Sequence, residues 1–257
     1  MKRIIVITIV SAMLFVLCSC GKSESIKAAE DAIAAIGEVT VESEAAIANA
    51  EKLYGILTDS EKAEVENRLE LVEAREAFDE LKGQCVYDNA KLAYEKLNNV
   101  AALCTTGMDD IYGAWYFGIY DADEWDSSSV LIMLSMETPS FTDNELQAAL
   151  KELGISAYSL TSSWEGCVYV VEMAHVQAGT YEKIKTLLEE THTIMQELTD
   201  KYGDYNYYPK LKEYYAKVSS YAEFFESPTG SFNQLANTIN DYENTIRTYQ
   251  TDVGFLF

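Results

Sequence analysis

The spacing of apolar residues constrains this chain most, because it repeats at steps of three and four residues over four long segments after residue 84. A step that averages 3.5 residues keeps one apolar stripe on one side of a helix. Helices with such stripes pack nearly parallel or antiparallel. The first stripe is formed by Tyr87, Ala90, Tyr94, Leu97, Ala101, Cys104 and Met108, and the others lie within 181–202, 211–225 and 232–249. The pattern predicts an all-α, multi-helix bundle over residues 84–257.

Shorter stripes in the first part of the chain predict a small helical module over residues 20–82. Gly37 favours a helix end there, because glycine adopts the left-handed conformation common at helix C-termini. Thr58 and Glu61 have the spacing of a capping box that opens a further helix. We expect the last helix of the module to end at Gly83. Each of these helices has one apolar face, so the module is stable only when the helices pack together.

Capping residues and helix breakers divide the second part into separate helices. A helix start is indicated wherever Ser or Thr precedes Glu or Gln by three positions, and an end is indicated by glycine or proline. The expected boundaries lie at Gly107, Thr142 with Glu145, Gly154, Gly179, Pro209 and Pro228–Ser231. Several of the helices between these boundaries are long.

Residues 115–135 are less regular in pattern, and they contain an acidic loop over residues 121–129. The carboxylates of Asp121, Asp123 and Asp126 are oxygen ligands of the kind that Ca²⁺ prefers. The loop lacks the glycine that an EF-hand has at its sixth position. It also lacks the glutamate of the twelfth position, where Ile132 stands instead. The sequence leaves weak cation binding by this loop open.

The first nineteen residues have the features of a secretory signal. Lys2 and Arg3 precede 14 almost entirely apolar residues, whereas a bilayer-spanning helix needs about 20. The segment ends in Leu17-Cys18-Ser19-Cys20, which resembles the lipobox of bacterial lipoproteins. The resemblance implies cleavage after Ser19 and a lipid on Cys20. We therefore expect residues 1–19 to be removed and the protein to be lipid-anchored at the extracytoplasmic face of the cell membrane.

The charge of the chain supports attachment through the lipid alone. The chain carries 42 acidic and 19 basic residues, a formal net charge of −23. Such a protein is repelled by anionic lipid headgroups and by the phosphates of nucleic acids. We predict no nucleic-acid partner, and contact with the membrane only through Cys20.

Three cysteines remain after Cys18 and Cys20, and an odd number cannot pair completely within one chain. Cys85 and Cys104 are predicted to share one helix, which separates them by roughly 28 Å and prevents a disulfide. A disulfide between Cys104 and Cys167 stays possible. The alternative is that both are small buried apolar residues.

Each of the two histidines follows a glutamate by three residues, as Glu172-x-x-His175 and Glu189-x-x-His192. Ferritin-like bundles hold two metal ions with Glu-x-x-His pairs on facing helices, so a metal-binding bundle is one hypothesis. In a continuous helix the two pairs are roughly 25 Å apart, and in a hairpin at Gly179 they are still about 13 Å out of register. Neither arrangement builds one shared site, so the primary expectation is no metal and no cofactor.

The sequence contains no nucleophile elbow, no His-Glu-x-x-His and no phosphate-binding loop, so we expect no enzyme. It also lacks the strand–helix alternation of transporter solute-binding proteins. Trp125, Tyr205, Tyr207 and Tyr208 lie outside the apolar stripes and are candidates for a binding surface, since exposed Tyr and Trp stack on sugars and anchor protein interfaces. The leading hypothesis is an interaction, adhesion or accessory binding module of the cell envelope with a protein or glycan partner.

Two stretches also resemble known bacterial surface proteins. The run 36–47 with residues 57–62 and 65–67 resembles a small helical module of extracellular proteins from Gram-positive Firmicutes. Segments 117–120, 153–156, 227–232 and 239–242 resemble lipoproteins of gut Firmicutes. These resemblances imply a cell-surface setting and bring no activity. The ligand and the oligomeric state stay open, and long stripes also permit dimers.

Overall fold

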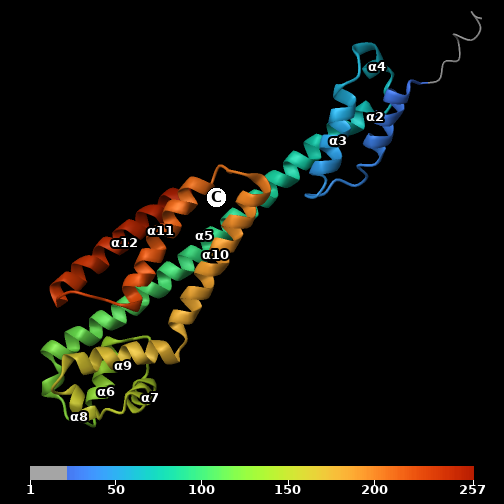
Figure 1. The fold of residues 1–257 in the computed structure, drawn as a ribbon. Helices are drawn as coiled ribbons and strands as arrows, with labels where there is room; N and C mark the ends of the chain where they lie inside the picture. Colours follow the sequence, from blue (N-terminus) through green and yellow to red (C-terminus); the bar gives the residue numbers. More distant parts are fainter. Residues whose placement is uncertain (1–21) are drawn as a thin grey trace, which may run out of the picture. The chain divides into compact units, whose positions relative to one another are not determined.

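A computed structural model describes residues 22–257, and this part of the chain is all-α, as predicted (Figure 1). The helices are α2 (Glu24–Ala34), α3 (Glu44–Gly55), α4 (Asp59–Glu64), α5 (Arg68–Tyr120), α6 (Val130–Glu137), α7 (Asp143–Leu153), α8 (Ala157–Leu160), α9 (Trp164–Gln177), α10 (Thr180–Tyr202), α11 (Tyr208–Glu226) and α12 (Phe232–Gly254), with one 3₁₀ helix, η1 (Ala122–Glu124). No β-strand occurs between residues 22 and 257. The predicted signal peptide 1–19 and the predicted lipid site Cys20 lie outside the described residues.

The described residues divide into two compact units, one that ends at Cys85 and one that spans Val86–Phe257. Helix α5 contributes residues 68–85 to the first unit and residues 86–120 to the second. The predicted helix ends at Gly83 and Gly107 are wrong, because α5 continues through both glycines. A glycine inside a helix costs only about 1 kcal/mol relative to alanine, which side-chain packing along the same helix readily offsets.

The first unit is built from α2, α3, α4 and the start of α5 around its own apolar core. That core contains Ile26, Ala29, Ile33, Ile47, Ala50, Leu57, Val65, Leu71, Ala74 and Phe78. Thr58 and Glu61 form the predicted capping box at the start of α4. Arg75 of α5 donates two hydrogen bonds of 2.7 Å to the two carboxylate oxygens of Glu51 in α3. This paired contact lowers the pKa of Glu51, because the guanidinium stabilises the charged carboxylate.

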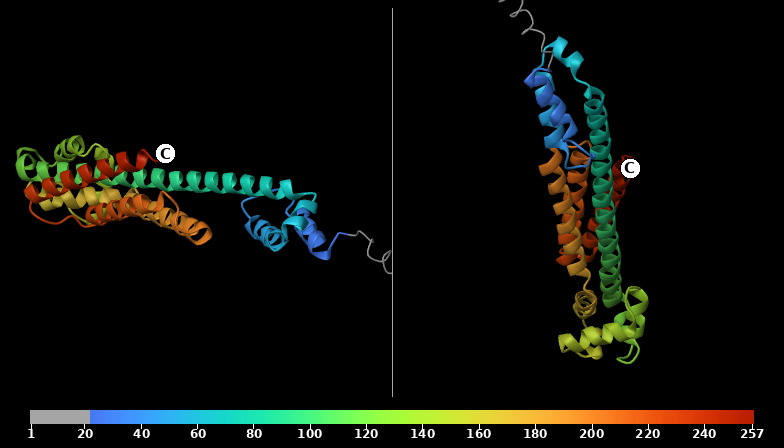
Figure 2. Two further views of the ribbon diagram at one scale, coloured as in Figure 1. Left: turned by 90° about the horizontal axis from the view of Figure 1, so that it is seen from above. Right: turned by 90° about the vertical axis from the view of Figure 1, so that its right-hand side faces the viewer.

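In the second unit, α10, α11 and α12 lie along α5, as the views in Figures 1 and 2 agree. The Tyr94 hydroxyl of α5 donates a 2.8 Å hydrogen bond to the backbone carbonyl of Gln250 in α12. Lys96 of α5 forms a 2.6 Å ion pair with Glu190 of α10. Polar contacts at the rim of the bundle therefore join α5 to α10 and to α12.

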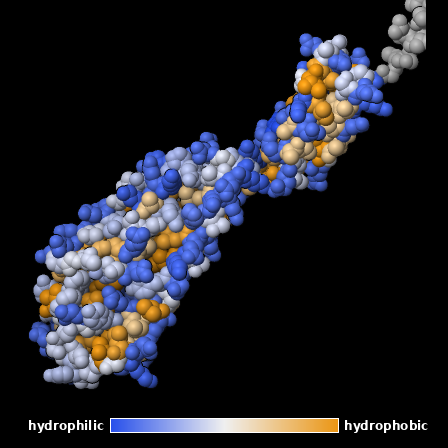
Figure 3. Space-filling view, viewed as in Figure 1, coloured by the Kyte–Doolittle hydropathy of each residue, from blue (hydrophilic) through white to orange (hydrophobic). Residues whose placement is uncertain are grey.

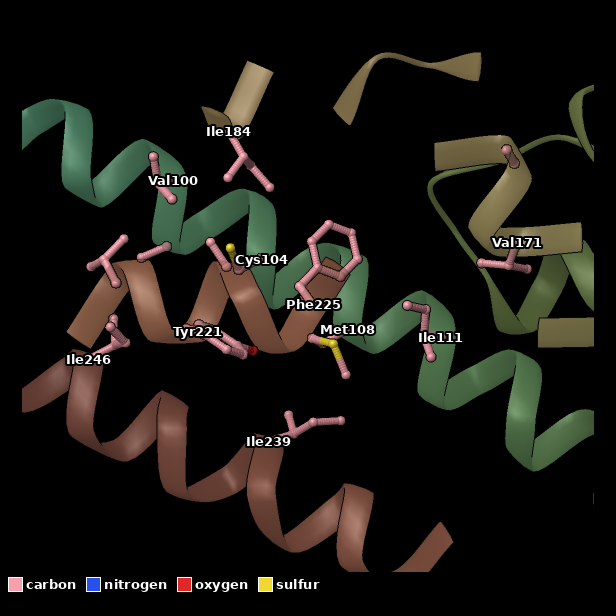
Figure 4. Packing of buried hydrophobic residues seen from close by; sticks show 14 of the residues in the cluster. Val100, Cys104, Met108, Ile111, Val171, Ile184, Tyr221, Phe225, Ile239 and Ile246 are labelled. Carbon is pink, nitrogen blue, oxygen red and sulfur yellow. The ribbon is translucent and has the colours of Figure 1, made fainter. Parts of the chain in front are cut away.

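The core of the second unit lies between these helices (Figure 4). Cys104 and Met108 of α5 point toward Tyr221 and Phe225 of α11, and Ile239 of α12 closes the other side. The buried faces of α5, α10, α11 and α12 follow the predicted apolar stripes, since most stripe residues are buried and the others are half-buried. Cys104 and Cys167 are both buried free thiols.

Two glycines of α5 allow other elements to approach its backbone closely. A Cβ atom at Gly113 would overlap the backbone carbonyl oxygen of Glu137 at the end of α6. A Cβ atom at Gly118 would lie 2.6 Å from the Cα atom of Trp164 at the start of α9. Only glycine leaves room for these backbone approaches, so α6 and α9 pack directly on α5.

Helices α6 to α9 gather around the C-terminal end of α5 (Figure 1). Their predicted boundaries are largely confirmed. Thr142 and Glu145 form a capping box at the start of α7, and Gly154 and Gly179 have φ angles of +68° and +70° in the turns after α7 and before α10. These positive angles favour glycine because a side chain would clash with its own backbone.

Candidate functional site

Four aromatic side chains form a half-exposed cluster on the second unit, which we call the aromatic cluster: Tyr112, Tyr116 and Tyr120 of α5 with Phe232 of α12. The tyrosines are four residues apart and therefore share one helix face. Phe232 stacks on Tyr112 with ring centres 4.9 Å apart, and Tyr116 and Tyr120 lie 5.0 Å apart. Tyr116 is 41% exposed and Tyr120 is 54% exposed, so both offer ring surface to a partner.

A packed tryptophan pair supports this cluster from inside. Trp115 of α5 is 8% exposed, and its ring stacks on that of Trp164 in α9 with centres 4.7 Å apart and planes 2° apart. Trp115 also lies 6.3 Å from the ring of Phe232. Gly118 brings the α9 backbone close enough for this stack. Phe232, which contacts all three tyrosines, therefore links the aromatic cluster to the packed tryptophan pair.

The sequence signal for this cluster is the i, i+4 spacing of its three tyrosines. We expected residues 115–120 to be less regular, whereas they form the last turns of α5. Continuing the stripe through Cys104 and Met108 places Ile111 and Trp115 in the core, where they are buried. Tyr112 and Tyr116 each follow a residue of this stripe by one position, so they lie on the helix face beside the buried one.

The predicted surface residues do not form one surface. Trp125 follows η1 and is 37% exposed. Tyr205 is only 7% exposed, so it belongs to the core and its assignment to a surface is wrong. Burial raises the pKa of Tyr205 to about 12, because the charged form would lose its hydration.

Tyr207 and Tyr208 are half-buried and lie near the other end of the second unit. The ring of Tyr207 packs against Phe257, with centres 5.1 Å apart, and against Tyr87 in α5, with centres 6.2 Å apart. Tyr87 and Tyr120 are 33 residues apart on one helix, which corresponds to about 50 Å. Trp125, which follows Tyr120 closely, therefore cannot share a binding site with Tyr207.

The four residues of the metal hypothesis do not converge either. His175 is buried near the end of α9, and Glu172 is half-buried, whereas Glu189 and His192 are exposed on α10. Residues 22–257 contain no group of three or more His, Cys, Asp or Glu side chains that could hold a metal ion. Burial raises the pKa of Glu172, because desolvation disfavours its charged form.

His175 instead faces Asp110, a residue that no sequence motif marks. Its Nε2 atom lies 3.4 Å from Oδ2 of Asp110, and the two residues are 3% and 0% exposed. Asp110 Oδ1 accepts a 3.2 Å hydrogen bond from the backbone N–H of Ser140. The rings of Phe141 and Phe225 pack edge-on against the imidazole, with centres 4.6 and 5.2 Å away. This buried pair joins α5 to the end of α9.

Asp121, Asp123 and Asp126 of the acidic loop do not form a group that could hold a cation, since no such group of three occurs in the described part of the chain. Asp126 Oδ1 accepts hydrogen bonds from the backbone N–H groups of Ser128 and Ser129, at 2.9 and 3.0 Å, and from the Ser128 hydroxyl, at 2.6 Å. These bonds lower the pKa of Asp126, since they stabilise its charged form. The carboxylate therefore closes the turn before α6.

Comparisons of the chain with protein families, with curated proteins and with solved structures find no match. Among the helices between residues 22 and 257, none combines the length and apolar character needed to cross a bilayer. The aromatic cluster is the feature of the described residues that most resembles a site for a partner.

Proposed function

We propose that this chain is a non-enzymatic binding module of the cell envelope, held at the extracytoplasmic face of the membrane by a lipid on Cys20. Its second unit would recognise a protein or glycan partner. The observation that carries this proposal is the aromatic cluster, in which Tyr116 and Tyr120 expose ring surface and contact Phe232, itself packed against Trp115.

Exposed tyrosines on a rigid helix suit recognition for physical reasons. A tyrosine contributes a large amphipathic surface and loses little conformational entropy on binding, because it has only two side-chain torsions. Residues of this type dominate the energy of interfaces, and truncating a central one typically costs 2 kcal/mol or more. Tyr116 and Tyr120 also contact each other and Phe232, so their orientation is already restricted. That restriction lowers the cost of ordering them against a partner.

The binding proposal is tested by capture on intact cells. The lipidated protein is cross-linked reversibly to its surroundings, and the captured molecules are identified by mass spectrometry. We expect a dominant partner with the wild-type chain and its loss with Tyr116→Ala/Tyr120→Ala. Tyr158→Ala is the control, because Tyr158 is 71% exposed but lies on α8, outside the aromatic cluster. Equal capture by all three proteins contradicts the proposed role of the cluster.

The anchoring proposal has its own test. Replacing Cys20 by alanine removes the sulfur that would carry the lipid. We expect the variant to appear in the medium, because the acidic chain has no attraction to anionic headgroups. Retention of Cys20→Ala in the membrane fraction contradicts a lipid anchor at this residue.

A further inference from the structure

A groove runs between α10 and α11 on the second unit, and Glu172 and Val176 of α9 border its first hollow. It consists of three adjoining hollows of about 520, 360 and 350 Å³. The first and second hollows share Tyr181, Glu182 and Glu226, and the second and third share Tyr215. Along α10 the lining extends from Tyr181 to Asp200, which corresponds to about 28 Å. The groove is therefore as long as a helical segment of about five turns.

The walls of the first two hollows are acidic, whereas the third is lined by one acidic residue, Asp200, and one basic residue, Lys212. Five glutamates line the first two hollows against one basic residue, Lys185; they are Glu172, Glu182, Glu189, Glu223 and Glu226. None of these glutamates is held in an ion pair with another part of the chain between residues 22 and 257. Five carboxylates along one groove repel one another, so a cationic occupant gains from each of them.

The floor of the groove is apolar and contains one unsatisfied polar atom. Ile184 and Leu188 of α10 and Tyr215 and Ala222 of α11 line the second hollow. Ser219 Oγ also lines it, is buried, and has no hydrogen-bond partner within the described part of the chain. Figure 3 shows hydrophobic residues at the surface of the second unit among hydrophilic ones. An occupant thus needs apolar side chains for the floor and positive charges for the rim.

We propose that the α10–α11 groove binds a basic amphipathic segment of a partner protein. Leucine-like side chains at helical spacing would contact the floor, and Lys or Arg side chains would face the glutamates of the rim. The inference rests on the proposed role of the chain as a binding module, but it concerns a different surface from the aromatic cluster. It adds a chemical class of partner, which the aromatic cluster alone does not define.

The test uses an 18-residue fluorescent peptide of leucine and lysine in an amphipathic helical pattern, and a leucine–glutamate peptide with the same pattern. Fluorescence anisotropy with the full chain measures the dissociation constant. We expect the lysine peptide to bind, with an affinity that falls as salt rises, and the glutamate peptide not to bind. Equal binding of both peptides overturns the proposal.

Two pairs of matched variants locate the binding. Glu182→Gln/Glu223→Gln removes two rim charges, and we expect the dissociation constant to rise about tenfold. Glu197→Gln/Glu213→Gln removes the same charge from exposed positions on the same two helices outside the groove, and we expect a change of less than about twofold. Equal weakening by both variants shows unspecific attraction to an acidic protein and overturns the proposal.

A third variant tests the groove without a change of charge. Ala216 is exposed and lines the third hollow, so Ala216→Trp fills that space. We expect weaker peptide binding, and unchanged binding contradicts a peptide seated along the groove. If these peptide tests fail while Tyr116→Ala/Tyr120→Ala still abolishes capture on cells, the groove proposal is wrong and the binding-module function stands. If capture is the test that fails, the function itself is wrong.

Discussion

Replacing His175 by alanine should destabilise the second unit strongly, because it leaves the Asp110 carboxylate buried without its partner. Asp110 is 0% exposed, and its other oxygen accepts only one hydrogen bond, from the backbone N–H of Ser140. Removing one side of a buried polar contact leaves the other group unsatisfied, which typically costs about 1–3 kcal/mol and more for a carboxylate, so we expect about 3 kcal/mol. Asp110→Ala removes the carboxylate itself, so we expect a smaller cost of about 1–2 kcal/mol.

The double variant distinguishes a coupled pair from two independent core residues. If the 3.4 Å contact between Nε2 and Oδ2 couples them, Asp110→Ala/His175→Ala should cost about 2 kcal/mol less than the sum of the single variants. His192→Ala is the matched control, because the other histidine is exposed on α10. We expect it to change stability by less than about 0.5 kcal/mol.

Urea unfolding followed by tryptophan fluorescence measures these costs for the second unit alone. The three tryptophans of the chain, Trp115, Trp125 and Trp164, all lie between residues 86 and 257. The Trp115–Trp164 stack is broken on unfolding, so the signal follows the packing of α5 against α9. Costs of the two single variants that add within about 0.5 kcal/mol would refute the coupling.

Three further predictions concern packing, cysteine chemistry and pH. Gly113→Ala should destabilise the second unit by about 1–3 kcal/mol, because the added Cβ meets a backbone oxygen of α6. Gly83 lies in the same helix, but a Cβ there meets nothing within 4 Å, so Gly83→Ala should be neutral or stabilising by up to about 1 kcal/mol. Thermal unfolding compares the two variants. Cys104 and Cys167 should react with a thiol reagent only on unfolding, because burial raises both pKa values to about 12; fast labelling of both in the native protein is the contrary result. Arg75→Ala should let the pKa of Glu51 rise toward 4.5, which NMR titration measures, and an unshifted pKa contradicts the pairing. A depressed carboxylate pKa stabilises the fold above pH 4.5, and this stability is lost as pH falls. The stability of the first unit should therefore depend less steeply on pH in the acid range in the variant than in the wild-type chain.

Local chemistry made several features of the fold predictable from the sequence. Capping boxes such as Thr142 with Glu145 satisfy backbone groups within one turn, so their residues alone define a helix start. Gly154 and Gly179 mark turns because their positive φ angles are a property of single residues. The apolar stripe through Cys104 and Met108 is buried, because the apolar face of an amphipathic helix packs against the core.

Features that depend on distant partners could not be predicted. Gly107 looks like a helix end, but it is an interior position of α5 where the ring of Phe225, far along the chain, occupies the space of a side chain. Asp110 is one of 42 acidic residues, and only the fold brings it to His175. Tyr205 lies in the loop between α10 and α11, where the sequence predicts exposure, but it is only 7% exposed. Exposure is set by tertiary packing, which local pattern does not contain.

The central claim is that the aromatic cluster of the second unit binds a partner on the cell envelope. The most direct measurement is the binding isotherm of the purified, unlipidated Cys20→Ala chain on intact cells that lack the protein. The account predicts saturable binding, which Tyr116→Ala/Tyr120→Ala weakens by about 30-fold and Tyr158→Ala leaves unchanged. Binding that does not saturate, or that all three proteins share equally, would contradict the account.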